Sequence, residues 1–476
     1  MFKNVLSNKT VKRATGAMLT GAMVLGMATG CGVSTTSTEA ENTESSQAAT
    51  TADVVDAGTV TNATNSNALV SSTQADGRTE VEFWYAGGKT AVGVIEEIVA
   101  DFNNSQDEYF VKTSTMADYD ETYQKVQAGI AGNVAPDVAL LEVDPAANLY
   151  NKEQLVDLNT FISEDADFDG DDYISVFFDQ GKDGDKVFAF PAYGTTQLMY
   201  YNKEVFEKAG IEPDSIKTWQ DLAEASKTIK DGGFATYGWE PMWNEDNLID
   251  MSFSNGAQLL SEDGKTVLIN SEEWVEVWEG IRTWIHDDQI MAVHSGGQGW
   301  EYWYDTMDDA LDGTAGGYTG SSGDQADLDF SIVGAMEQPA WDDDSESLPT
   351  ARAKQLVAFE QSPEEEQKGA YEFIKFFTNP DNQAKWSLAT GYVSVRNSTQ
   401  DNEEFKAYSE EHPEILVPLA QSSHGSVMPI DPTGGEIYDA LSIAADKVEL
   451  EGVSAQEALD EAAETAQKAL DKVNEQ

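Results

Sequence analysis

The amino-acid sequence predicts an α/β protein in which helices cover both faces of a mostly parallel β-sheet. Strand-like and helix-like segments alternate over residues 80–143, and a similar succession recurs over residues 187–240. The last third of the chain is strongly helical. Roughly 400 residues follow the N-terminal region, and a folded chain of that length usually forms two domains.

The first alternation begins with EVEFWYA (80–86), whose β-branched and aromatic side chains predict a strand. AVGVIEEIVADFNNS (91–105) places apolar side chains at helical spacing. YFVKTST (109–115) then predicts a strand, YDETYQKVQAGIAG (119–132) a helix and DVALLEV (137–143) a buried strand. This order implies parallel strands joined by helices.

The second alternation begins with VFAFPAYGTTQLMYYN (187–202), which predicts a strand. NKEVFEKAG (202–210) and TWQDLAEASKTIKD (218–231) predict helices before YGWE (237–240). The C-terminal helices are predicted from apolar spacing at residues 363–378, 379–390, 434–452 and 454–476. Ser454 followed by Glu457 predicts a capping box at the start of the last helix.

The stretch VLGMATGCGVSTTS holds Cys31, the one cysteine of the chain, which rules out an internal disulfide or a zinc site built on cysteine pairs. Four basic residues precede it, Lys3, Lys9, Lys12 and Arg13, followed by a short apolar run. This order is typical of a secretory signal peptide. The order Ala28-Thr29-Gly30-Cys31 resembles a bacterial lipobox, so Cys31 is the expected lipidation site. A plain signal peptide with an incidental cysteine is the alternative.

Composition and charge indicate an acidic protein outside the cell. Residues 32–78 are rich in Ser, Thr, Ala and Asn and lack aromatics, which predicts a disordered tether. The formal net charge is −58, and removal of residues 1–30, with four basic and no acidic residues, gives −62. Such a surface repels nucleic acid, so no nucleic-acid partner is expected.

Motifs for enzyme chemistry fail at defining positions. FWYAGGKT ends like a P-loop, but Phe83 stands where the first glycine is required. The acidic loop Asp165–Asp172 begins like an EF-hand, but Val176 replaces the bidentate glutamate at position twelve, which favours a solvated turn and leaves calcium open.

No catalytic residue and no metal ligand is predicted. The chain has four histidines, His286, His294, His412 and His424, and their spacing matches no metal-binding motif. The serine-hydrolase motif Gly-x-Ser-x-Gly is absent from the sequence. Glycoside hydrolysis by paired carboxylates stays open, because separation in space is invisible in a sequence.

Aromatic residues give the clearest indication of a ligand. GWEPMWN supplies Trp239 and Trp243, and GWEYWYD supplies Trp300, Tyr302, Trp303 and Tyr304. Aromatic rings with nearby acids and amides suit sugars, because the ring stacks on C–H faces and the polar groups bind hydroxyls. Trp239 and Trp243 lie beside Gly, Pro and Asn and are the preferred cleft residues, whereas Trp274, Trp278 and Trp284 are expected in the core.

The order of phrases along residues 80–476 resembles the extracellular solute-binding lipoproteins of ABC importers, which carry sugars or glycerol-3-phosphate. The resemblance rests on VEFWYAGG, YQKVQAGIAGNVAPDVALLE, FAFPAYGTTQLMYYNKEVFEKAGIEPDSIKTWQDLAEASK, NGAQLLSEDGKTVLINSEE, GAYEFIKFFTNPDNQAKWSLATGYVSVRNST and SAQEALDEAAET. It implies a two-lobe periplasmic-binding-protein type II fold with a hinge and a helical C-terminal region.

The resemblance also implies discontinuous lobes, with crossings near FPAYGT and at 339–351. The expected divisions are a lipoprotein signal peptide (1–30), a tether (31–78), lobe 1 (79–190 and 341–391) and lobe 2 (191–340 and 392–476, the last with the C-terminal helices).

The ligand-binding residues that the resemblance implies come from matching positions. Lys89 matches a lysine after the first strand, Glu142 and Asp144 match cleft acids, and Tyr392 matches the tyrosine of a Gly-Tyr-Leu-Pro turn in which Ser394 here replaces Pro. With the aromatic candidates, the full expected set is Tyr85, Lys89, Tyr119, Glu142, Asp144, Tyr193, Thr195, Trp239, Trp243, Tyr318, Ser321, Tyr392 and Tyr438.

The function expected from these features is a monomeric, lipid-anchored receptor outside the cytoplasm. It binds a mono- or oligosaccharide without cofactor or catalysis and delivers it to the permease subunits of an ABC importer with a cytoplasmic ATPase. A receptor for glycerol-3-phosphate or a glycerophosphodiester is the first alternative, although only Arg352 remains to supply the expected phosphate contacts. A surface glycoside hydrolase is the alternative of another class.

Overall fold

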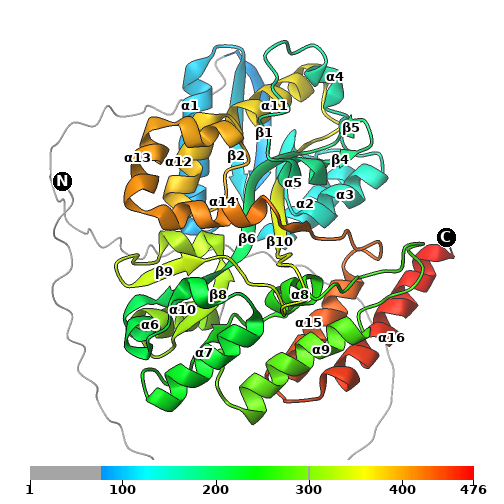
Figure 1. Ribbon diagram of the computed structural model, residues 1–476. Coiled ribbons are helices and arrows are strands. Elements are labelled where there is room, and N and C mark those ends of the chain that lie inside the picture. The colour runs from blue at the N-terminus through cyan, green and yellow to red at the C-terminus, as the bar shows by residue number, and fades with distance from the viewer. Residues whose placement is uncertain (1–76, 298–300, 476) are drawn as a thin grey trace, which may run out of the picture. The chain divides into compact units, whose positions relative to one another are not determined.

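A mixed nine-stranded sheet connects the two halves of the structure, a computed structural model that describes residues 77–297 and 301–475 (Figure 1). The strand order is β2-β1-β3-β10-β6-β8-β7, with β11 beside β10 and β9 beside β6. The strands are β1 (Thr79–Tyr85), β2 (Tyr109–Thr115), β3 (Val138–Leu141), β6 (Phe190–Asn202), β7 (Glu240–Pro241), β8 (Gly317–Ser321), β9 (Val333–Met336), β10 (Thr350–Ala358) and β11 (Ser426–Val427), while β4 (Lys182–Asp183) and β5 (Lys186–Val187) form a separate pair.

The first alternation of strands and helices is confirmed. Strand β1 pairs in parallel with β2 and β3, and the predicted helices connect them. The apolar face of the first helix, α1, is buried as its spacing predicts: Val94, Ile95, Ile98, Val99 and Phe102. The rest of the sheet is mixed rather than mostly parallel. Strand β10 is antiparallel to β3 and β6, and β6 is antiparallel to β8 and β9, whereas β7 is parallel to β8 and β11 to β10.

Two sets of helices surround this sheet. Those of the first lobe are α1 (Lys89–Ser105), α2 (Tyr119–Gly132), α3 (Val143–Asn151), α4 (Asn159–Ile162), α5 (Ser175–Phe178), α11 (Glu364–Phe377), α12 (Pro380–Thr390), α13 (Glu403–Glu411) and α14 (Val417–Ser422). Those of the second lobe are α6 (Lys203–Ala209), α7 (Trp219–Gly232), α8 (Glu245–Ser254), α9 (Glu272–Arg282), α10 (Glu301–Asp312), α15 (Glu436–Glu449) and α16 (Ala455–Asn474). Short turns of other helix types are η1 (Asp179–Gly181), η2 (Pro213–Ser215), η3 (Thr283–Asp287), η4 (Ser322–Ala326), η5 (Asn397–Asp401) and η6 (Pro413–Leu416).

None of the described helices is both long and apolar enough to cross a membrane. The signal peptide, Cys31 and all but the last two residues of the expected tether lie outside the described residues.

Each lobe has its own apolar core. The first core gathers side chains of β1, α1, α11 and α12, with Phe83 against Phe373 and Trp386 against Phe377. The second core is built around Trp278 and other buried tryptophans of the second lobe, as expected for that residue. Helices α15 and α16 contact each other and α9, and add a row of small buried residues to this core (Figure 1).

The C-terminal part of the chain divides between the two cores. Val393 and Val395 belong to the first core, and α13 contacts α12. Helices α15 and α16 pack in the second core, and Met428 packs against it. The assignment of all of 392–476 to the second lobe therefore differs from the structure, because helical spacing reveals a buried face but not its partner. Ser454 caps α16 by accepting a hydrogen bond from the N–H of Glu457.

Strand β6 passes from one lobe to the other. Its first part pairs with β10, from Phe190 to Thr196, and its second part pairs with β8 and β9. Gln421 Nε2 donates to Thr196 Oγ1 (2.7 Å), which donates in turn to the carbonyl of Thr350 (2.8 Å). These bonds fix the two crossing strands to each other and to α14.

A buried carboxylate holds the beginning of β10 from the second lobe. Asp250 of α8 accepts hydrogen bonds from the N–H of Thr350 (2.9 Å), its hydroxyl (2.7 Å) and Gln338 Nε2 (2.7 Å). Burial raises the pKa of Asp250 to about 6, while its donors oppose the shift. The side chain therefore links α8 to the beginning of β10 and to the segment that precedes it.

Asp250→Ala should lower the free energy of unfolding by about 3 kcal/mol or more, because three buried donors lose their acceptor. The exposed Asp343→Ala is the matched control and should change stability by less than about 0.5 kcal/mol. Urea denaturation followed by circular dichroism measures both, and equal stability of the two variants would contradict the structural role of Asp250.

Candidate functional site

A cavity of about 620 Å³ is lined by residues of both lobes and of the crossing strands. This volume lies within the range typical of small-molecule sites. Six residues of the expected ligand-binding set line it: Lys89, Tyr119, Glu142, Thr195, Ser321 and Tyr392.

The beginning of α1 forms one part of the wall. Gly88 precedes the helix, and Gly88, Lys89, Thr90 and Ala91 all line the cavity. The first N–H groups of an α-helix have no acceptor within the helix and carry a partial positive charge. Lys89 is exposed, and within the described residues no carboxylate pairs with it. The GGKT ending thus gives a cationic helix start rather than a P-loop.

Aromatic rings form the neighbouring part of the first lobe. Tyr193 is stacked on Trp386, with ring centroids 4.6 Å apart, and lies 4.8 Å from the ring of Tyr392. The hydroxyls of Tyr119 and Tyr193 are hydrogen-bonded at 2.5 Å. Tyr193 is itself buried, so it supports Tyr119 and Tyr392, which face the cavity.

Strand β10 contributes two cations to the cavity. Lys354 forms an ion pair with Glu142 and lies 4.5 Å from the ring centre of Tyr119. Arg352 Nη2 donates to Asp246 Oδ1 of α8 at 2.6 Å. Burial opposes the charge of Arg352, but the carboxylates of Asp246 and Asp250 outweigh this effect and raise its pKa.

The second lobe contributes helix α10 and the turn that follows β8. Trp303 Nε1 donates to Asp324 Oδ1 at 2.8 Å, and the Tyr318 hydroxyl donates to Asp324 Oδ2 at 3.1 Å. Burial raises the pKa of Asp324 to about 7, against these two donors. Tyr304 lines the cavity and is 54% exposed, so its ring is open to contact with a ligand.

Three residues of the expected set are buried in the cores and do not reach the cavity. The hydroxyl of Tyr85 bonds to Glu96, and Tyr318 is stacked on Tyr200. Trp239 is fully buried, and its Nε1 donates to Thr319 Oγ1 at 2.9 Å. The choice of Trp239 as a cleft residue is wrong.

Gly317, the first residue of β8, gives the physical reason for the position of Trp239. A Cβ atom at Gly317 would lie 2.3 Å from Cζ3 of Trp239, so the glycine leaves space for the indole in the core. Gly317 therefore accommodates Trp239.

Three further members of the expected set lie beside the cavity without lining it. Trp243 Nε1 donates to Asp446 Oδ1 at 2.8 Å, and the Tyr438 hydroxyl donates to the carbonyl of Pro429 at 2.5 Å. Asp144 lies near Asp431, and burial together with the charge of Asp431 raises the pKa of Asp144 to about 6. Glu142, rather than Asp144, is the acid of this segment that faces the cavity.

Several lining residues are absent from the expected set. Trp303 and Tyr304 line the cavity and come from the aromatic segment GWEYWYD. The prediction had preferred Trp239 and Trp243 of the other aromatic segment, GWEPMWN. Arg352 and Lys354 are two residues apart on β10, so alternation along the strand places them on one face. That spacing in TARAKQL is a signal that would have found both.

The acidic loop at 165–172 forms ion pairs with basic side chains of the same chain. Asp165 accepts from Lys375 Nζ at 2.6 Å, and Asp172 accepts from Arg396 Nε at 2.6 Å. Both ends of the loop are thus held by side chains of the first lobe.

Comparison with known proteins identifies one family of extracellular binding proteins. The sequence profile described as bacterial extracellular solute-binding protein matches residues 97–413. The sn-glycerol-3-phosphate-binding periplasmic protein UgpB of Rhizobium meliloti (strain 1021) is 26% identical over 364 residues, which are 73% of this chain and 82% of the relative.

Solved structures share the two-lobe fold. UgpB from Mycobacterium tuberculosis in complex with glycerophosphocholine gives a TM-score of 0.72 at 22% identity, over 83% of this chain and 99% of that one. The cyclic α-maltosyl-1,6-maltose binding protein from Arthrobacter globiformis gives 0.69 at 21% identity, over 83% and 100%. These similarities confirm the expected fold, and the ligand has to be argued from the cavity.

Asp324→Asn should flatten the dependence of stability on pH. The folded protein holds the Asp324 proton up to about pH 7, whereas an unfolded chain releases it near pH 3.9, so this stabilisation is full below about pH 4 and lost by about pH 7. Between about pH 5 and pH 8 the wild type should therefore lose more unfolding free energy than the variant. The exposed Asp343→Asn should follow the wild type, and identical slopes for all three proteins would contradict the assignment.

Proposed function

Because this chain belongs to the bacterial extracellular solute-binding proteins, we propose that it captures a mono- or oligosaccharide in the cavity between its lobes and delivers it to an ABC importer. The observation that carries the proposal is an exposed aromatic ring, Tyr304, in a cavity lined by both acidic and basic groups. Apolar ring faces and hydrogen-bonding groups of both kinds are what a sugar requires.

The polar groups of the cavity suit a ligand rich in hydroxyls. It is lined by four carboxylates and three cationic side chains, and two of those cations are already paired with acids on the wall. The acids accept hydrogen bonds from hydroxyl groups, and Lys89 donates to a ring or hydroxyl oxygen. Tyr304 replaces Trp239 as the proposed stacking partner, with Tyr119 and Tyr392 on the opposite lobe.

Capture is proposed to close the two lobes about β6 and β10. Residues of both lobes line the cavity, so the ligand contacts more surface in a closed form than in an open one. The free energy of these additional contacts drives closure, and the permease recognises the closed form.

The remaining features of the proposal concern the location of the receptor. A signal peptide over residues 1–30 and a diacylglycerol on Cys31 would hold the protein at the outer face of a membrane. The tether would let the monomeric two-lobe body reach the permease, and no chemistry is done on the ligand.

A second candidate ligand is glycerol-3-phosphate or a glycerophosphodiester. The specific observation in its favour is the beginning of α1, where Lys89 and backbone N–H groups line the cavity near an anion-binding helix terminus. Arg352 and Lys354 would add charge if a phosphate replaced their carboxylate partners. The names of the curated relatives point in the same direction.

A thermal-shift panel of glucose, maltose, maltotriose, glycerol-3-phosphate and glycerophosphocholine identifies the ligand class, because a ligand at 100 times its dissociation constant adds about 2.7 kcal/mol of stability. Recovery of the intact sugar after incubation separates a receptor from a glycoside hydrolase. Hydrolysis of the bound oligosaccharide would overturn the receptor proposal.

Tyr304→Ala should weaken binding of the identified sugar about tenfold, because the exposed ring loses its stacking and buried area. Trp243→Phe is the matched control, since Trp243 lies beside the cavity without lining it, and should bind within about twofold of the wild type. Isothermal titration calorimetry measures both, and a larger loss for Trp243→Phe would place the stacking site elsewhere.

Lys89→Met separates the two ligand classes. A phosphate ligand should lose about tenfold or more in affinity, and the loss should shrink at high salt, because the exposed cation is screened. A neutral sugar should lose only one hydrogen bond, with little dependence on salt. Calorimetry at low and high salt measures the difference, with the exposed Lys472→Met as control.

A further inference from the structure

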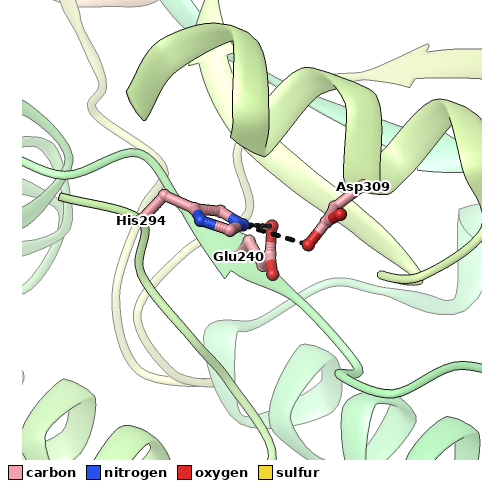
Figure 2. A group of neighbouring side chains, drawn as sticks. All are labelled: Glu240, His294 and Asp309. Atoms are coloured by element: carbon pink, nitrogen blue, oxygen red, sulfur yellow. Dashed lines mark hydrogen bonds and ion pairs between the residues drawn. The ribbon is translucent and has the colours of Figure 1, made fainter. Parts of the chain in front are cut away.

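Three side chains from separate segments of the second lobe converge away from the residues assigned to ligand binding (Figure 2). Glu240 lies on β7, His294 in the loop after η3, and Asp309 on α10. One ligand atom from each residue lies within 4.8 Å of the other two. The three side chains point toward one another in Figure 2.

Glu240 is the unusual member of this group. Its side chain is completely buried, and neither carboxylate oxygen has a hydrogen-bond partner among the described residues. A buried carboxylate without a partner costs several kcal/mol if it is ionised. Both oxygens lie beside His294 and Asp309 and are available to bind a cation.

The distances fit one small cation. His294 Nε2 lies 3.0 Å from Asp309 Oδ2 and 3.8 Å from Glu240 Oε2. Ligand bonds of 2.0–2.1 Å in a tetrahedral zinc site separate neighbouring ligand atoms by roughly 3.3 Å. These two separations lie on either side of that value, and the carboxylate oxygens of Glu240 and Asp309 lie within 4.8 Å of each other, so side-chain shifts would bring all three atoms into contact with one ion.

We propose that Glu240, His294 and Asp309 form a Zn²⁺ site in the second lobe. One imidazole and two carboxylates leave a fourth position for water, as in three-ligand zinc sites. Magnesium and calcium prefer sites made of oxygen ligands only, so the histidine favours zinc. The two carboxylates balance the charge of the ion.

The surroundings of the three ligands allow an ion to enter and hold the ligands in place. His294 and Asp309 are 36% and 25% exposed, whereas Glu240 is buried below them. The backbone of Glu240 pairs with Tyr318 of β8. The N–H of Ala292 donates to the carbonyl of Trp239, which holds the loop of His294 beside the strand.

Bound zinc would connect α10 to the sheet of the second lobe. Asp309 lies on the same helix as Trp303 and Tyr304, which line the ligand cavity. The ion would thus fix the position of that wall without touching the ligand. This role is independent of whether the ligand is a sugar or a phosphate.

Titration of the chelator-treated full chain with Zn²⁺ tests the proposal, with millimolar Mg²⁺ and Ca²⁺ present to occupy the many surface carboxylates. Calorimetry should show one tight site per chain. Replacement by Co²⁺ should give the intense visible absorption of four-coordinate cobalt, which reports the coordination geometry directly.

His294→Ala and Glu240→Gln should each reduce zinc affinity at least tenfold and abolish the cobalt absorption. The partly exposed His294 tolerates truncation, and glutamine preserves the shape of Glu240, so both variants should keep the wild-type circular dichroism spectrum. His424→Ala is the matched control, because His424 is a partly exposed histidine paired with Glu337, and it should bind zinc like the wild type.

Three outcomes would overturn the site. The first is the absence of a tight zinc site in the wild type. The second is wild-type affinity in both His294→Ala and Glu240→Gln, which would mean adventitious binding to the acidic surface. The third is an equal loss in His424→Ala, which would show that any surface histidine suffices.

Discussion

The antiparallel pairing of β6 with β10 is the constraint on which the rest of the structure depends. Both strands belong to the connections between the lobes, and Asp250, Gln421 and Thr196 hold them through buried hydrogen bonds. The same strands line the cavity, with Thr195 on β6 and Arg352 on β10. Ligand contact and lobe position are therefore set by one pair of strands, so a ligand that touches them acts directly on the hinge.

The charged groups of the cavity connect the hinge to each lobe in turn. Arg352 bonds to Asp246 in the second lobe, and Lys354, two residues later, pairs with Glu142 in the first. Such pairs orient both partners before a ligand arrives, and separating them inside a protein is costly. A ligand must satisfy these groups as well as the pairs it disturbs, and this requirement is a source of selectivity.

The sequence predicted the positions of helices and strands better than it predicted which of them pack or pair together. Apolar spacing located α1 and the C-terminal helices, since a buried face leaves a period of 3.6 residues. It did not reveal that β10 returns antiparallel beside β6, because a strand carries no mark of its neighbour. Trp239 was wrong for a similar reason: Gly and Pro nearby suggested a loop, whereas the space left by Gly317 places the ring in the core. Glu240, His294 and Asp309 come from three separate segments, so no spacing within one segment could have predicted their cluster.

Trp303 has a consequence for how this protein can be observed. Of the tryptophans in the described ranges, it alone lines the cavity, while several others are enclosed in the cores. Its indole N–H donates to Asp324, and burial raises the pKa of this carboxyl group to about 7. The emission of an indole depends on the charge and water next to it, so a ligand that enters the cavity would change the fluorescence of Trp303. Trp303 is therefore an intrinsic fluorophore on the cavity wall.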